Sequence, residues 1–71
     1  MREYVVILEP GPKNWSAYVP DLPGCIATAK TRDEAQSLIR EAIQLHIAFL
    51  RSEGDEIPEP TSEAVRVAVG A

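Results

Sequence analysis

The sequence contains little of what small proteins use to stabilise themselves or to catalyse reactions. It has a single cysteine, Cys25, and a single histidine, His46. No disulfide can form within the chain, and two such residues are too few for a structural zinc site. A core built from 71 residues supplies only about 3 to 5 kcal/mol of net stability, so natural domains of this size commonly add a second subunit. We therefore expect one domain, spanning residues 1–71, that forms a homodimer or a higher homo-oligomer.

Basic clusters and long apolar runs are also missing. Lys and Arg number 7 against 11 Asp and Glu, which gives a formal net charge of -4. This balance opposes binding to phosphate backbones and favours a basic partner. The charged start at Arg2 and Glu3 and the short apolar run 4–8 fit neither a signal peptide nor a membrane-spanning segment. The sequence thus indicates a cytoplasmic protein that binds neither DNA nor a membrane directly.

Three segments of β-strand character come first in the chain. Residues 4–8 form a short apolar run without polar alternation, which is typical of a central strand covered on both faces. Residues 15–19 alternate with period two after the turn-forming cluster 10–14, so the first two strands should form a hairpin. Residues 25–30 predict a third strand, with small side chains on the face that a helix would cover.

The helix that follows has the clearest start signal in the chain. Thr31 with Glu34 three residues later fits a capping box, in which each side chain bonds an otherwise unpaired backbone N–H. Gly54 is the natural C-terminal stop. The apolar positions between them share one wide stripe that should face the sheet: Ala35, Leu38, Ile39, Ala42, Ile43, Leu45, His46, Phe49 and Leu50.

The segment after the helix predicts the last strand. Residues 53–63 are acidic and contain Pro58 and Pro60, so they should run extended over the surface, and residues 65–69 alternate valines as a short strand does. A right-handed crossover places this strand beside the first one, in sheet order 3-2-1-4. The predicted fold is therefore α+β, β-β-β-α-β, a single mixed sheet covered by one long helix. The last strand could instead complete a neighbour's sheet.

The corner between the second and third predicted strands is the most specific local sequence. Pro20 and Pro23 fix φ, Asp21 can hydrogen-bond its own following backbone, and Gly24 can take a positive φ. One interpretation is a rigid corner in which Leu22 plugs the core. The other is a preformed rim of a binding surface.

Taken together, these motifs resemble the N-terminal domain of the HicB antitoxins. The segments that carry the likeness, which covers residues 3–62, are Pro20-Asp21-Leu22-Pro23-Gly24-Cys25, Thr31 with Glu34-Ala35, and Gly54 with Ile57-Pro58-Glu59-Pro60. The resemblance implies a reduced ribonuclease H-like fold and the neutralisation of a HicA-type toxin by covering the surface where that toxin cleaves RNA. Residues 29–31 depart from the Gly-Asp-Thr that the family often has. Full-length HicB proteins also carry a C-terminal DNA-binding domain that these residues lack, so operator binding by this chain alone is not expected.

A ribonuclease H likeness also raises a metal-dependent nuclease as a rival function. That chemistry needs several carboxylates that converge on Mg²⁺. The interior of the first predicted strand is apolar, Glu3 and Glu9 lie at its ends, and Asp21 lies in a turn. We interpret His46 as a core or interface residue and Cys25 as a small buried one. The sequence therefore predicts a protein that is not an enzyme and that needs no cofactor or metal.

The remaining candidates are residues for contacting a partner. Trp15 and Tyr18 fall on opposite faces of the second predicted strand, so at most one can lie beneath the helix. Glu56 and Glu59 either complement a basic toxin or belong to a solvated linker. The alternative is that this chain is an orphan domain, without a toxin partner, that forms oligomers and binds another protein or a ligand. The candidate partner-binding residues are Trp15, Tyr18, Asp21, Leu22, Glu56 and Glu59.

Overall fold

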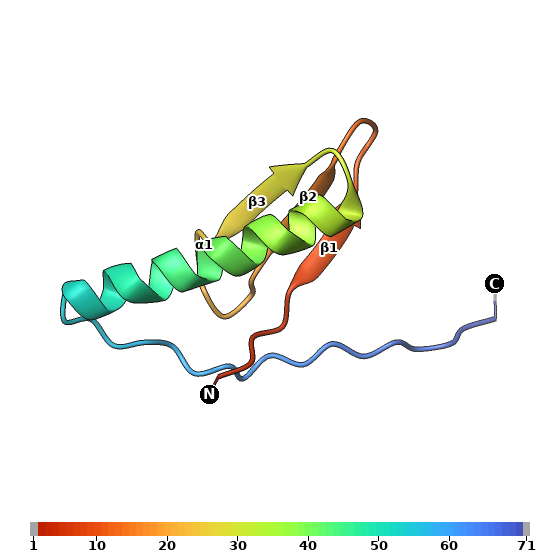
Figure 1. Cartoon of the computed structure of the whole chain (residues 1–71). Helices are drawn as coiled ribbons and strands as arrows, with labels where there is room; N and C mark the ends of the chain where they lie inside the picture. Colours follow the sequence, from red (N-terminus) through yellow and green to blue (C-terminus); the bar gives the residue numbers. More distant parts are fainter. Residues whose placement is uncertain (1, 71) are drawn as a thin grey trace.

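The computed structural model describes residues 2–70 and contains one sheet and one helix. The elements follow the order β1 (Ile7–Pro10), β2 (Trp15–Tyr18), β3 (Ile26–Ala29) and α1 (Arg32–Ser52). The strands form an antiparallel sheet in the order β1-β2-β3, and α1 packs across one face of it (Figure 1). The predicted α+β class, its first three strands and its long helix are confirmed.

Small side chains on the inner face of the sheet let α1 pack closely against it. In the register of the sheet, Leu8 lies opposite Ala17 and Ala17 lies opposite Ala27. Ala17 on β2 and Ala35 on α1 are both buried, as close packing of a helix on a sheet requires. The buried core is small and consists of Ala17, Val19, Leu22, Cys25, Ala35 and Ile39.

The corner between β2 and β3 forms the closed turn that its sequence predicts. Leu22 is 0% exposed and lies in the core. The N–H of Leu22 donates to the carbonyl of Val19 at 3.1 Å, and the N–H of Cys25 donates to the carbonyl of Leu22 at 3.0 Å. Gly24 has a φ of 85°, in the region that side chains disfavour. The prediction that Leu22 plugs the core at this corner is therefore confirmed.

The start of α1 shows one of the two hydrogen bonds of the predicted capping box, and its end shows the predicted glycine stop. The hydroxyl of Thr31 accepts a hydrogen bond from the N–H of Glu34 at 3.1 Å. At the other end Gly54 has a φ of 72°, and the N–H of Asp55 donates to the carbonyl of Leu50 at 2.9 Å. A left-handed glycine at this position satisfies carbonyls that the helix leaves unpaired. Local sequence thus determines where α1 begins and ends.

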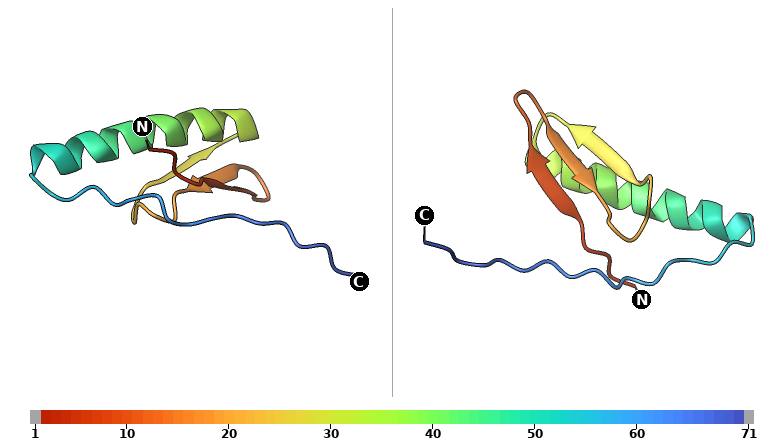
Figure 2. Two further views of the ribbon diagram at one scale, coloured as in Figure 1. Left: turned by 90° about the horizontal axis from the view of Figure 1, so that it is seen from below. Right: turned by 180° about the vertical axis from the view of Figure 1, so that it is seen from behind.

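The predicted strand order is not found, and β1 does not occupy the centre of the sheet. β1 begins at Ile7 rather than at Tyr4, and it is an edge strand because only β2 pairs with it. Residues 65–69, predicted as a strand, run extended without a pairing partner in the part of the chain that the structure describes. The segment 53–62 returns beneath the sheet and leads the last residues away from it (Figure 2).

The length of α1 leaves part of its apolar stripe uncovered. Its 21 residues span about 30 Å, whereas a strand of four residues spans only about 13 Å. The C-terminal half of α1 consequently extends past the sheet (Figure 1). Leu45 is 72% exposed and Phe49 is 60% exposed, so the expectation that the whole stripe faces the sheet is wrong for these positions.

Candidate partner-binding surfaces

The outer face of the sheet presents an apolar row. Ile7, Tyr18 and Ile26 lie opposite one another in the strand register, on the face that points away from α1. Tyr18 and Ile26 are exposed. Trp15 is half-buried and packs against the core instead. The prediction that at most one of the two aromatic residues lies beneath the helix is confirmed, and Tyr18 is the one available to a partner.

A second apolar surface lies along one flank of α1. Leu38, Leu45 and Phe49 follow one another at helical spacing and are exposed; we call them the helix-flank patch. Glu34 and Glu41 share this side of the helix and are also exposed. Between the patch and the start of β3 runs an open groove of about 330 Å³, lined by Gly24, Cys25, Ile26, Ala42, Leu45, His46 and Phe49. This flank therefore combines apolar contact area with negative charge.

Sequence reasoning missed the helix-flank patch because it treated the apolar stripe as one face and did not consider how much of that face the sheet could cover. A signal was available in the lengths of the predicted elements. The stripe spreads over a helix much longer than the strands beneath it, and a short strand cannot cover both halves of such a helix. Leu38 and Leu45 also lie at the edge of the stripe, next to the acidic positions.

Asp21 acts as a clamp rather than as an exposed rim residue. Its carboxylate accepts hydrogen bonds from the N–H of Ser62 at 3.0 Å, from the hydroxyl of Ser62 at 2.9 Å and from the hydroxyl of Thr61 at 3.2 Å. The backbone hydrogen bond from Ser62 is the main cause that lowers the pKa of Asp21. The predicted bond to its own following backbone is replaced by these distant partners. Asp21 thus holds the end of the acidic stretch against the corner.

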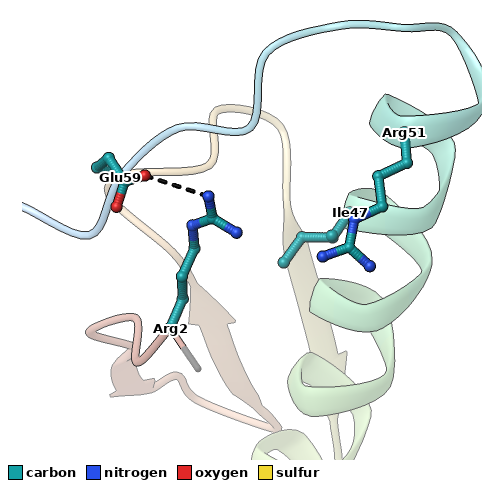
Figure 3. A pocket seen from close by; sticks show the side chains of 4 residues that line it. All are labelled: Arg2, Ile47, Arg51 and Glu59. Atoms are coloured by element: carbon teal, nitrogen blue, oxygen red, sulfur yellow. Dashed lines mark hydrogen bonds and ion pairs between the residues drawn. The ribbon is translucent and has the colours of Figure 1, made fainter.

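The two glutamates of the acidic stretch lie in different surroundings. Glu56 is exposed, whereas the carboxylate of Glu59 forms an ion pair with Arg2 at 3.1 Å. Figure 3 shows this pair beside Ile47 and Arg51 of α1, which line the same shallow pocket. Both partners of the pair are solvent-exposed, so it contributes about 0 to 1 kcal/mol at most. Glu56 therefore offers the freer negative charge to a partner.

Between residues 2 and 70, no group of three or more His, Cys, Asp or Glu side chains is placed to hold a metal ion. Burial raises the pKa of the Cys25 thiol, which disfavours the nucleophilic thiolate. His46 is half-buried beside the helix-flank patch. Over the same residues, no helix is both long and apolar enough to cross a membrane.

A small two-layer α+β domain with apolar and acidic outer surfaces is suited to binding another macromolecule. The sequence profile of the family described as "HicB-like antitoxin of bacterial toxin-antitoxin system" matches residues 4–68. The chain belongs to this family, as the resemblance over residues 3–62 predicted.

Relatives of this chain come from archaea, bacteria and a phage. A UPF0150 protein of Thermoplasma acidophilum is 34% identical over 67 residues, which are 94% of this chain and 97% of that protein. A UPF0150 protein of Helicobacter pylori is 37% identical over 51 residues, 72% of this chain and 68% of that protein. An uncharacterized 14.9 kDa protein of Haemophilus phage HP1 is 32% identical over 56 residues, 79% of this chain but only 42% of the phage protein.

Proposed function

We propose that this protein is an antitoxin that binds a HicA-type toxin and covers the surface with which the toxin cleaves RNA. Membership of the HicB-like antitoxin family carries the proposal. The family match spans residues 4–68 and so includes every strand, the helix and the acidic stretch. In this proposal the chain acts by binding the toxin and does not itself catalyse a reaction.

The helix-flank patch is the surface that we assign to the toxin. An RNA-cleaving protein must present a cationic surface to the phosphate backbone. Leu45 and Phe49 offer exposed apolar contacts, and Glu34 and Glu41 lie beside them with the opposite charge. Apolar anchors supply most of the affinity at such interfaces, whereas the charges mainly steer encounter and select the partner.

The acidic stretch and the sheet supply secondary contacts in this proposal. Glu56 projects negative charge into solvent, and Tyr18 is exposed on the outer face. Leu22 has no exposed surface and Trp15 packs against the core, so this proposal assigns neither a direct contact with the toxin, contrary to the sequence-based expectation. Asp21 keeps the acidic stretch in place through its bonds to residues 61 and 62.

The first test identifies the partner and then measures neutralisation. The tagged full chain is recovered from its native cell, the bound protein is identified by mass spectrometry, and cleavage of RNA by that protein is followed as the full chain is added. Cleavage should fall in proportion to added antitoxin until the proteins are about equimolar. Undiminished cleavage at excess antitoxin contradicts the proposal. Recovery of further copies of this chain alone supports instead the orphan oligomeric domain.

A pair of neighbouring substitutions tests the assigned surface. Leu45→Glu introduces a charge into the helix-flank patch, and Gln44→Glu introduces the same charge at an exposed position that points away from it. The Leu45 variant should need at least about fivefold more protein for half-inhibition, because losing an interface anchor weakens binding by more than about 1 kcal/mol. The Gln44 variant should inhibit as the parent does. Equal inhibition by both variants would move the interface elsewhere.

A further inference from the structure

The last residues of the chain have the pattern of a strand but no strand to pair with. Val65, Val67 and Val69 are between 75% and 79% exposed. Because side chains alternate along an extended backbone, these valines share one face, and Ala64, Arg66 and Ala68 share the other. β-Branched residues of this kind favour strands, and an extended segment leaves its backbone N–H and C=O groups free to exchange water for the edge of a sheet. We call residues 64–69 the tail.

The free edge of β1 borders a groove that is partly apolar. β1 pairs with β2 alone among the described strands. Glu9 and Pro10 protect the end of β1, whereas Ile7, Leu8 and the residues 4–6 before them carry neither charge nor proline. Between this edge and α1 lies an open groove of about 860 Å³. Its apolar lining consists of Val6 and Leu8 on the sheet side and Ile39 and Ile43 on the helix side. Charged and polar side chains, among them Glu3, Arg32 and Arg40, line the rest. A strand added beside β1 would direct one apolar face into this groove.

The tail does not lie in the groove of its own chain. Asp21 holds Ser62 at the corner between β2 and β3, and from there the tail leads away from the sheet (Figure 2). The radius of gyration is 13.8 Å and the longest dimension is 48 Å. A compact chain of this length has a radius of gyration of about 11 Å. The valine face is therefore projected to where a second molecule can receive it.

We propose that the tail of one chain adds to the free edge of β1 in a second copy of this protein, with its valines in the groove between β1 and α1. The second copy returns the same contact, because segment and groove are both present on every chain and a two-fold arrangement fills both grooves at once. The Asp21 clamp sets the direction in which the tail leaves its own domain. The fourth strand that the sequence predicts beside β1 is then supplied by the partner chain. This inference does not depend on the toxin proposal, since it uses a different surface.

Two full-length variants with the same charge change test the tail. Val67→Lys places an ammonium group on the valine face, whereas Ala68→Lys places it on the opposite face. The parent and the Ala68 variant should be dimers at micromolar concentration by sedimentation equilibrium. The Val67 variant should dissociate with a Kd raised about a hundredfold or more, because a buried valine is lost in each of two copies. A monomeric parent, or equal dissociation of both variants, overturns the proposal.

Cross-linking between two distinguishable chains tests whether the tail pairs with a second copy or folds back onto its own chain. Full-length Val67→Cys and isotope-labelled full-length Val6→Cys are mixed and treated with a short bifunctional maleimide; the buried native Cys25 is left in place. Exchange predicts products that join one labelled and one unlabelled chain. If no mixed product forms, or if a chain with both substitutions links only within itself, the tail does not pair with a second copy and the proposal fails.

Discussion

Replacement of Leu22 by alanine measures how much of this fold depends on one side chain. Leu22 is 0% exposed and lies in the core cluster at the corner between β2 and β3. The N–H of Val19 donates to the carbonyl of Cys25 at 3.2 Å and closes the corner. The corner therefore has little freedom to collapse into the cavity that the substitution would leave. Removal of a buried leucine costs about 2 to 5 kcal/mol, and a domain of this size has only about 3 to 5 kcal/mol to lose. The variant should therefore lose most of its stability, and a measurable fraction should be unfolded at 25 °C without denaturant.

Leu45→Ala is the matched control, since it makes the same chemical change at a side chain that is 72% exposed. Alanine is a strong helix former, so the free energy of unfolding should change by no more than about 0.5 kcal/mol. Urea unfolding followed by the circular dichroism of α1 compares the variants, at one protein concentration because self-association would add to the apparent stability.

The reasoning fails if the two leucine variants shift the urea midpoint equally. Equal shifts would show that burial of Leu22 does not set the stability of the corner. A Leu22→Ala protein with the midpoint of the parent would likewise refute the assignment of this side chain to the core.

Three further predictions follow from the corner, the acidic stretch and the clamp. Gly24→Val meets no atom within 4 Å of the added Cβ, so its cost comes from the φ of 85° and should lower the free energy of unfolding by about 1 to 3 kcal/mol in calorimetry; an unchanged melting temperature would contradict this. Glu56→Lys with Glu59→Lys should keep the melting temperature but slow association with a basic toxin, most clearly at low salt; association as fast as the parent's would make the stretch a solvated linker. The pKa of Asp21 is lowered from its ordinary value of 3.8, mainly by the Ser62 N–H, so the clamp is fully present above that pH and is lost as pH falls through the lowered pKa. The amide resonance of Ser62 should report this titration, and Asp21→Asn should abolish it; a titration that survives in the variant would assign it to another group.

The sequence alone determined the features that depend on neighbours a few residues apart. Thr31 caps α1 through the N–H of Glu34, and Gly54 ends the helix with a positive φ. Gly24 and Leu22 form the corner that the local residues predict. Each of these features follows from backbone conformation or from hydrogen bonds within one turn, which the local sequence specifies. The alternation of Trp15 and Tyr18 could be predicted for the same reason.

Only the tertiary structure decided the features that join distant parts of the chain. The carboxylate of Asp21 bonds Ser62, which is 41 residues away, although the local sequence predicts a bond to its own turn. The exposure of Leu45 and Phe49 depends on how far the sheet extends beneath α1, and the free edge of β1 depends on the path of the segment after the helix. Hydrophobic periodicity identifies an apolar face but not the surface that covers it. The exposed apolar side chains on α1 lie where the sheet is too short to cover the apolar face of the helix.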